Sequence, residues 1–285
     1  MEQRVLGKTG LKISIYTFGG IIVKELPQNE ANNIVAEAVD SGINYFDVAP
    51  SYGNSQEILG PALKPYRSKV FLACKSNRRT KAESWAELEK SLVSLKTDYF
   101  DVYQLHEVKP DEVDTVLGPG GALETLIEAR QKGLVKYIGI TSHFDEAALK
   151  LINAFDFDTL LFPINWACWL KNGLGQTALK EATKKNMGQI AIKALAERAK
   201  EAAGDGYPRC WYRPICDDPE LADKALRFTL SQGVHTAVSP GDIRMHKLGL
   251  SIIGKYPGKI PPLNAKELED LQKRAKLIEH TVFPH

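Results

Sequence analysis

Four residues in the first third of the chain carry side chains that can hold or move a proton: Asp47, Tyr52, Lys75 and His106. Together they suit acid–base chemistry at a carbonyl oxygen, with Tyr52 donating a proton as the oxygen becomes an alkoxide. A nearby Lys75 ammonium would favour the phenolate and lower the pKa of Tyr52. Asp47 would keep Lys75 charged in a partly dry pocket. The alternative is a structural Asp47–Lys75 ion pair, with Tyr52 and His106 merely packed in loops.

These four residues lie at or just past the ends of three short apolar runs, YFDV, VFLACK and FDVYQLH. Each run has the length and composition of a buried strand. If the three strands are neighbours in one parallel sheet, their carboxyl ends share an edge and the four side chains converge there. The sequence therefore predicts an enzyme.

Strand-like and helix-like segments alternate along the whole chain. A polar opening, RVLGKTGLKI, predicts a β-hairpin, and eight strand–helix units follow it. The segment NAKELEDLQKRAKLIEH predicts an extra C-terminal helix with a capping box at Asn264. This pattern favours an α/β fold, a (β/α)8 TIM barrel forming a single domain over residues 1–285. An open doubly wound sheet is the weaker alternative, because TFGGIIVKEL does not match the G-x-G-x-x-G signature.

Bulk composition excludes several classes of protein. The net charge of +2 implies no strong attraction to nucleic acid or to an anionic membrane. No apolar stretch approaches the roughly 20 residues that cross a bilayer, and the opening MEQRVLGKTG is unlike a secretory signal. The cysteines are too scattered for a disulfide framework or a metal site: Cys74, Cys168, Cys210 and Cys216. We therefore expect a cytoplasmic protein without a bound metal.

At these residues the sequence resembles the aldo-keto reductases. The stretch GINYFDVAPSYGNSQEILGPAL resembles the signature around their catalytic aspartate and tyrosine. VFLACK, DVYQLH and YIGITSHF resemble the strands that carry the lysine, the histidine and a nicotinamide-binding pair, and the similarity runs through the eighth strand. The resemblance implies reversible, nicotinamide-dependent reduction of a small-molecule aldehyde or ketone. Tyr52 would protonate the carbonyl oxygen, helped by Lys75 and His106.

The same resemblance implies a set of cofactor-binding residues. Ser142 would bind the nicotinamide carboxamide, while His143 replaces the usual asparagine and Asn165 lies near the usual glutamine. The glycines after the first strand match those that let the backbone approach the ribose. The complete implied set is Gly19, Gly20, Asp47, Ser142, His143, Asn165, Lys193, Ser239, Gly241 and Arg244.

The phosphate-binding end, SPGDIRMHK, departs from the family pattern. Ser239 and Gly241 would present backbone N–H groups at a helix start, which is an anion site. Lys193 ends an apolar strand and is expected to contact a phosphate. Arg244 would reach a 2′-phosphate, whereas Asp242 beside it would oppose one and favour a ribose hydroxyl. The family's own preference favours NADP(H) slightly over NAD(H).

The expected substrate pocket consists of Tyr52, His106, Trp166 and Trp169. Trp166, Trp169 and Trp211 are placed in loops beyond strand ends, where indole rings would wall a pocket for a hydrophobic carbonyl compound. Core packing of at least one of them is the alternative. The tail TVFPH is expected to close over the barrel mouth.

Two questions stay open at this level. The segment 194–217 is either a lid over the cofactor diphosphate or a solvated basic loop. Two rival functions also stand beside the reductase: a nicotinamide-binding sensor or regulatory subunit with little turnover, and a Schiff-base lyase that uses Lys75 or Lys193 as the nucleophile. Substrate identity and oligomeric state are not predicted.

Overall fold

The computed structural model describes residues 1–201 and 206–283. Residues 202–205 of the segment 194–217, and the last two residues of the TVFPH tail, lie outside the described residues.

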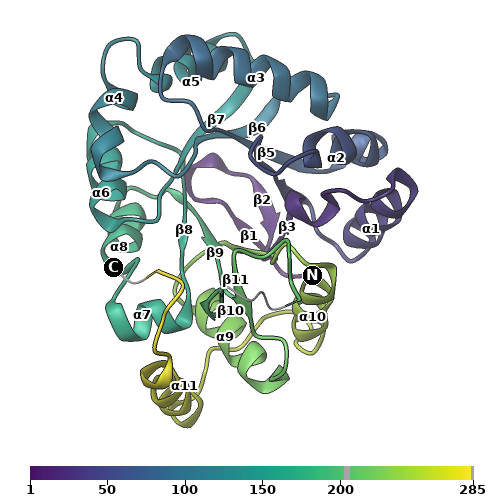
Figure 1. Cartoon of the computed structure of the whole chain (residues 1–285), viewed down its shortest axis with the longest axis vertical. Helices are drawn as coiled ribbons and strands as arrows, with labels where there is room; N and C mark the ends of the chain where they lie inside the picture. Colours follow the sequence, from purple (N-terminus) through teal and green to yellow (C-terminus); the bar gives the residue numbers. More distant parts are fainter. Residues whose placement is uncertain (202–205, 284–285) are drawn as a thin grey trace.

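Among the described residues, eight parallel strands close into a barrel (Figure 1). Their order around the barrel is β12-β3-β4-β5-β6-β7-β8-β9, which confirms the predicted (β/α)8 fold and excludes the open sheet. The strands are β3 (Tyr16–Gly19), β4 (Tyr45–Asp47), β5 (Phe71–Ser76), β6 (Phe100–Leu105), β7 (Val135–Thr141), β8 (Thr159–Pro163), β9 (Gly188–Ile192) and β12 (Thr236–Val238).

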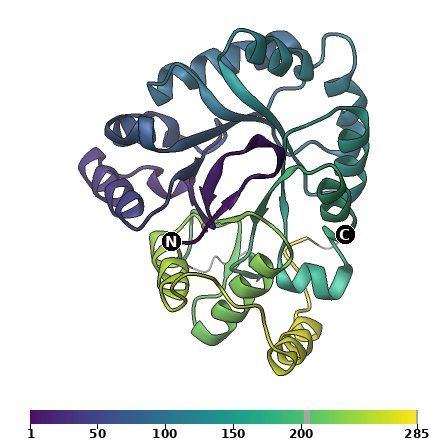
Figure 2. The same ribbon diagram turned by 180° about the vertical axis from the view of Figure 1, so that it is seen from behind.

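An antiparallel hairpin covers the N-terminal end of the barrel, as the opening sequence predicts (Figure 2). It consists of β1 (Gln3–Val5) and β2 (Lys12–Ser14). Leu6 and Ile13 are fully buried and fill the bottom of the barrel interior against Tyr45. Gly7 has φ +50°, and a Cβ there would lie 2.4 Å from the Gly188 nitrogen, so only glycine fits this turn.

An outer layer of helices surrounds the strands (Figure 1). It contains α1 (Gln28–Asp40), α2 (Ser55–Leu63), α3 (Lys81–Leu95), α5 (Ala122–Gln131), α6 (Asp145–Ala154), α8 (Gln176–Lys184), α9 (Pro219–Ser231) and α10 (Ile243–Gly254). Capping residues explain where two of these helices begin. Thr80 accepts a hydrogen bond from the Glu83 backbone N–H at the start of α3, and Asp218 caps α9 ahead of Pro219. Leu88 and Leu95 are buried and lie on the side of α3 that packs against the barrel.

Several shorter elements were not foreseen. These are α4 (Val113–Leu117), α7 (Trp166–Asn172), a hairpin of β10 (Ala196–Ala199) with β11 (Tyr212–Pro214), and the 3₁₀ turns η1 (Gly7–Thr9), η2 (Gly20–Val23), η3 (Lys64–Lys69) and η4 (Pro110–Glu112). Trp166 and Trp169 lie on α7, so the prediction that they lie in a loop is wrong. Asn165 starts α7 there, because its side chain accepts hydrogen bonds from the backbone N–H groups of Ala167 and Cys168.

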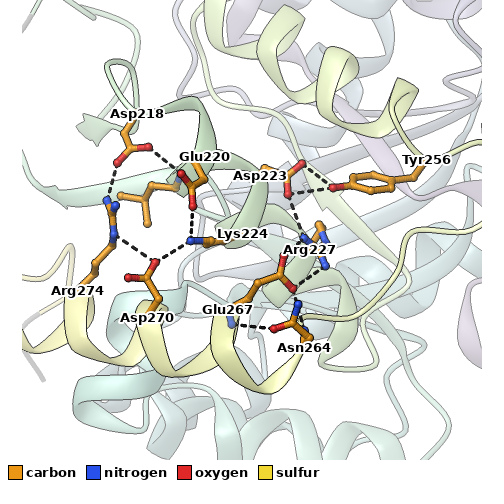
Figure 3. Close-up of polar contacts among 11 residues, drawn as sticks. Asp218, Glu220, Asp223, Lys224, Arg227, Tyr256, Asn264, Glu267, Asp270 and Arg274 are labelled. Atoms are coloured by element: carbon orange, nitrogen blue, oxygen red, sulfur yellow. Dashed lines mark hydrogen bonds and ion pairs between the residues drawn. The ribbon is translucent and has the colours of Figure 1, made fainter.

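The predicted C-terminal helix is α11 (Ala265–Leu277), and its capping box at Asn264 is confirmed. Charged side chains join α11 to α9 (Figure 3). Arg227 donates to both Glu267 oxygens at 2.7 and 3.0 Å, and Lys224 donates to Asp270 at 2.7 Å. After α11 the chain returns to the barrel mouth.

Hydrogen bonds hold this returning segment, residues 278–283, over the barrel. The Ala199 backbone N–H donates to the His280 carbonyl at 3.0 Å, and the Asn172 amide donates to the Thr281 hydroxyl at 3.2 Å. Val282 and Phe283 reach the cavity at the barrel mouth. The described part of the tail thus closes part of this mouth, as predicted.

Candidate active site

A cavity of about 390 Å³ opens at the C-terminal ends of the barrel strands. Its walls include the predicted proton-transfer tetrad, which is Asp47, Tyr52, Lys75 and His106. Asp47 is the last residue of β4, Lys75 lies near the end of β5, and His106 follows β6 directly. Adjacent parallel strands therefore bring these groups to one rim, as their positions in the sequence predict.

Lys75 and Asp47 form a buried ion pair. Lys75 Nζ donates to Asp47 Oδ2 and, at 3.2 Å, to the Val48 carbonyl, and Gln104 Nε2 donates to Asp47 Oδ1 at 3.2 Å. Burial opposes the charge on Lys75, but the Asp47 carboxylate outweighs this effect and raises the pKa of Lys75 above its ordinary value. The ammonium is therefore charged at neutral pH. Gln104, on the inner face of β6, was not foreseen.

Tyr52 follows β4 and lies beside this ion pair, with Lys75 Nζ 5.3 Å from the centroid of its ring. Burial raises the pKa of Tyr52 to about 12, although the Lys75 charge opposes the rise. The Lys75 charge favours a lower pKa of Tyr52, as expected, but burial is the larger effect and the net pKa lies above the ordinary value. Tyr52 remains protonated at neutral pH and can donate its proton.

His106 contacts Tyr52 edge to face, with ring centroids 6.2 Å apart. Its Nδ1 forms a hydrogen bond with Asn77 Oδ1. Burial, followed by the Lys75 charge, lowers the pKa of His106 well below its usual value, so the ring is neutral at pH 7. Asn77 was not foreseen. It lies two residues beyond Lys75 in CKSN, on the same side of the extended chain, and this spacing was an available signal.

Lys193 enters the cavity directly after β9. Its Nζ lies 5.2 Å from the ring centroid of Trp211, 4.9 Å from that of Tyr212 and 6.0 Å from that of Phe283. Burial lowers the pKa of Lys193 to about 8, with the Glu107 carboxylate opposing the shift. This residue is a cation in a wall made mainly of aromatic rings.

Glu107, directly after His106, is a further cavity residue that was not foreseen. Its Oε1 lies 3.8 Å from His106 Nε2 and 3.6 Å from His143 Nε2. Its backbone has φ +49°, an unusual conformation for a residue other than glycine. This left-handed conformation turns the chain sharply at the rim of the barrel. The position of Glu107, a charged residue next to the predicted catalytic histidine, was the sequence signal that could have identified it.

The structure divides the predicted cofactor residues into two groups. The cavity is lined by Gly19, Asp47, His143, Lys193, Ser239 and Gly241. Gly20, Ser142, Asn165 and Arg244 lie outside its lining.

Ser142 and Asn165 are fully buried and make hydrogen bonds to backbone groups. The Ser142 hydroxyl donates to the Val108 carbonyl at 2.8 Å. The Asn165 amide donates to the carbonyls of Lys193 and Ala196 at 2.9 and 2.8 Å while its oxygen caps α7. In this conformation the two side chains position the strand ends around the cavity.

The prediction that tryptophan rings line the substrate pocket is correct only in part. Trp166 is fully buried and donates from Nε1 to the Ala196 carbonyl at 3.0 Å, and Trp169 packs edge-on against Phe228. Neither ring lines the cavity, because α7 directs both toward neighbouring elements. Trp211 does line it, with its ring centroid 5.5 Å from that of Tyr52.

At the predicted phosphate end, Asp242 caps α10 and accepts a hydrogen bond from the Arg244 backbone N–H at 2.9 Å. The same carboxylate binds the Arg244 guanidinium at 2.9 and 2.8 Å. Arg244 also lies over the Tyr207 ring at 4.2 Å. The helix start therefore already carries an anion of its own, and Arg244 is engaged with it.

The remaining groups fit a dinucleotide that contains a flat ring and a diphosphate. A Cβ at Gly19 would lie 2.9 Å from the Ser239 carbonyl oxygen, so the two strand ends approach closely only with glycine there. Lys193 supplies a positive charge, and Ser239 and Gly241 border the same space.

Two features are absent from residues 1–201 and 206–283. In this part of the chain no helix is both long and apolar enough to span a bilayer. In the same part, no group of three or more His, Cys, Asp or Glu side chains is arranged to hold a metal ion.

Comparison with known proteins identifies the class to which this barrel belongs. The sequence model of the Aldo/keto reductase family matches residues 15–204. The chain is 26% identical to the uncharacterised oxidoreductase YqkF of Bacillus subtilis (strain 168), over 97% of both chains. It is 31% identical to L-galactose dehydrogenase of Arabidopsis thaliana, over 50% of this chain and 48% of that protein.

A solved structure shows the same fold. The aldo-keto reductase AKR11C1 from Bacillus halodurans, in its holo form, matches with a TM-score of 0.72 at 22% identity, over 100% of this chain and 98% of that one. This chain belongs to the aldo/keto reductase family. It is thus an oxidoreductase from a family that acts on small-molecule carbonyl compounds with nicotinamide cofactors.

Proposed function

We propose that this chain, acting as one barrel domain over residues 1–285, reversibly reduces an aldehyde or ketone with Tyr52 as the general acid. One observation carries the proposal: a protonated Tyr52 phenol lies beside the charged Lys75–Asp47 pair in the cavity at the barrel mouth. A phenol that keeps its proton at neutral pH can supply it to a carbonyl oxygen, and the neighbouring ammonium stabilises the phenolate that remains.

Each tetrad residue has one task in this reaction. When bound, a nicotinamide cofactor would supply the hydride that the carbonyl carbon accepts. Tyr52 donates its proton to the carbonyl oxygen, and Lys75 stabilises the resulting phenolate. Asp47 keeps Lys75 charged and in place. The neutral His106 ring donates from Nδ1 to Asn77, so its Nε2 accepts a hydrogen bond from the alcohol hydroxyl and orients that oxygen. In the reverse direction the Tyr52 phenolate accepts the proton of the alcohol.

We assign the cofactor to the cavity side that Gly19, His143, Ser239 and Gly241 border. Ser142 and Asn165 support this wall through their backbone hydrogen bonds in the described conformation. The family resemblance favours NADP(H), with Arg244 contacting the 2′-phosphate. Because Asp242 holds Arg244, that contact requires the guanidinium to exchange one partner for another. Separate titrations with NADPH and NADH test this preference.

The Tyr52→Phe variant tests the general acid. We expect about 10²- to 10⁴-fold slower carbonyl reduction, the usual range for loss of a positioned proton donor. The Kd of the cofactor should change less than about threefold, because only one hydroxyl is removed. Tyr66→Phe, in the 3₁₀ turn η3 away from the cavity, is the matched control and should keep full activity.

Two results would contradict the reductase. Cofactor binding by a wild-type protein that reduces no member of a broad aldehyde and ketone panel would favour a nicotinamide sensor. A covalent substrate adduct trapped by borohydride on Lys75 or Lys193 would favour the Schiff-base lyase.

A further inference from the structure

Lys193 is a charged side chain in the cavity with no carboxylate at ion-pair distance in the described part of the chain. Lys75 differs, because Asp47 binds it directly. Lys193 is partly buried, and an ammonium without a counter-charge is costly where protein replaces the water around it. The tetrad chemistry does not use Lys193, so this cost calls for another explanation.

The backbone holds Lys193 in place. Its φ of +67° is unusual for a residue other than glycine. Its carbonyl accepts hydrogen bonds from the Asn165 amide at 2.9 Å and from the Ala196 backbone N–H at 3.0 Å. These contacts fix an unfavourable backbone conformation that directs the side chain into the cavity, and such strain is commonly retained at binding sites.

Aromatic rings surround the ammonium on several sides. Trp211, Tyr212 and Phe283 contribute them, from the β10–β11 hairpin segment and from the C-terminal tail. Ring faces attract a cation modestly, but they provide no full negative charge. They also displace part of the water around the ammonium, which strengthens the attraction of Lys193 for an anion that enters.

Lys193 and Tyr52 line the same cavity, and both lie close to the Trp211 ring. The Trp211 ring centroid lies 5.2 Å from Lys193 Nζ and 5.5 Å from the Tyr52 ring centroid. A small molecule with its carbonyl at Tyr52 can therefore extend a second group toward Lys193. The Glu107 carboxylate lies by the two histidines instead and would repel an anion there.

We propose that Lys193 binds an oxyanion of the substrate, so that this reductase prefers aldehydes and ketones carrying a carboxylate or phosphate group. This inference rests on the proposed function. A cofactor diphosphate presents the same oxyanion chemistry, and the sequence predicts that Lys193 contacts such a phosphate. The experiment therefore measures substrate and cofactor binding separately.

The first test compares two substrates that differ only in charge, para-carboxybenzaldehyde and its neutral carboxamide analogue, para-carbamoylbenzaldehyde. We expect Lys193→Met to raise the KM of the carboxylate substrate by about 10- to 100-fold, the value of a charge-assisted hydrogen bond. The KM of the carboxamide and the Kd of each cofactor should change less than about threefold. Lys193→Arg, which keeps the positive charge, should retain most of the preference for the carboxylate over the carboxamide substrate.

Lys247→Met is the control, because Lys247 is an exposed lysine that pairs with Glu37 on the outer layer. It should behave as wild type. Equal loss with both aldehydes, or no loss with either, would overturn the proposal. A weaker cofactor Kd with unchanged discrimination would assign Lys193 to the cofactor diphosphate and would also overturn it.

A second measurement does not depend on turnover. Calorimetry compares benzoate with benzamide, neither of which serves as a carbonyl substrate, in complexes saturated with oxidised cofactor. Wild type and Tyr52→Phe should both bind benzoate at least about tenfold more tightly than benzamide, and Lys193→Met should lose this difference. If that pattern holds while wild type reduces no carbonyl compound, only the reductase proposal fails. If aldehydes are reduced but benzoate shows no preference, only the Lys193 proposal fails.

Discussion

At the scale of single residues, burial and neighbouring charge set the protonation states in the cavity. Burial alone disfavours the ionised form of every group, so it raises the pKa of Tyr52 and lowers that of Lys193. Lys75 is the exception and keeps its charge, because the Asp47 carboxylate contacts it directly. The cavity therefore contains a phenol that remains protonated, a lysine that remains charged and a second lysine that titrates within the working pH range.

The pKa of about 8 at Lys193 gives a pH prediction. Below this pH the amine is protonated and attracts a carboxylate, and above it the charge is lost. We expect kcat/KM for para-carboxybenzaldehyde to fall about tenfold per pH unit above about pH 8. The same ratio for para-carbamoylbenzaldehyde should stay nearly level between pH 7 and 9, because Tyr52 keeps its proton to about pH 12.

Other titratable groups face Lys193 and could contribute to that profile. They are His106 and Glu107 after β6, Cys210 before β11, and Tyr212 at the start of β11. Lys193→Met separates their effects, since it should make the carboxylate profile as level as the carboxamide profile. A fall above pH 8 that persists in this variant would contradict the assignment to Lys193.

At the scale of elements, the C-terminal helix α11 matters because it brings the tail to the cavity. The helix packs against α7 and α9, and Arg227 on α9 is the centre of their polar contacts (Figure 3). It donates to Glu267 and Asp223 and, at 3.2 and 2.9 Å, to the carbonyls of Pro261 and Pro262. Arg227 therefore joins both the helix and the preceding loop to the barrel.

We expect Arg227→Met to lower the free energy of unfolding by about 3 kcal/mol, because it leaves mostly buried carboxylates without their partner. Urea denaturation measures this change. Lys273→Met, which removes an exposed pair with Glu269, is the control and should cost less than about 1 kcal/mol. Equal midpoints for the two variants would show that the Arg227 contacts add nothing to stability.

Sequence patterns predicted the long elements better than the short ones. Capping residues such as Thr80, Asp218 and Asn264 marked helix starts, because a cap and the following turn lie within a few residues. Helix α7 has only seven residues, WACWLKN, with no extended apolar period, so its two tryptophans resembled loop residues. The β10–β11 hairpin was missed because its strands pair across a long connection.

At the scale of the whole molecule, the residues that line the cavity and those that close the barrel core lie at opposite ends of the barrel. The cavity lies at the C-terminal ends of the strands, while the β1–β2 hairpin closes the opposite end (Figure 2). Leu6 fills that closed end and is fully buried. Substitutions there should change stability without changing the tetrad.

Leu6→Ala tests this separation. We expect a loss of about 3–5 kcal/mol in the free energy of unfolding, because truncating a buried leucine leaves a cavity in a packed core. At a temperature where the variant stays folded, kcat/KM should remain within about twofold of wild type, since the tetrad lies at the far end. Val5→Ala, at the adjacent exposed position, is the control and should change neither quantity. A large loss of activity in folded Leu6→Ala would contradict the separation.

The sequence by itself determined the barrel, the closing hairpin, the capped C-terminal helix and the convergence of Asp47, Tyr52, Lys75 and His106. These features follow from local periodicity and from the rule that parallel strand ends meet at one rim. Only the tertiary structure decided the direction of the pKa shift at Tyr52, the contacts of Trp211 with Tyr52 and Lys193, and the unpaired charge of Lys193. Those properties depend on burial and on side-chain contacts between segments far apart in the chain, which no local pattern encodes.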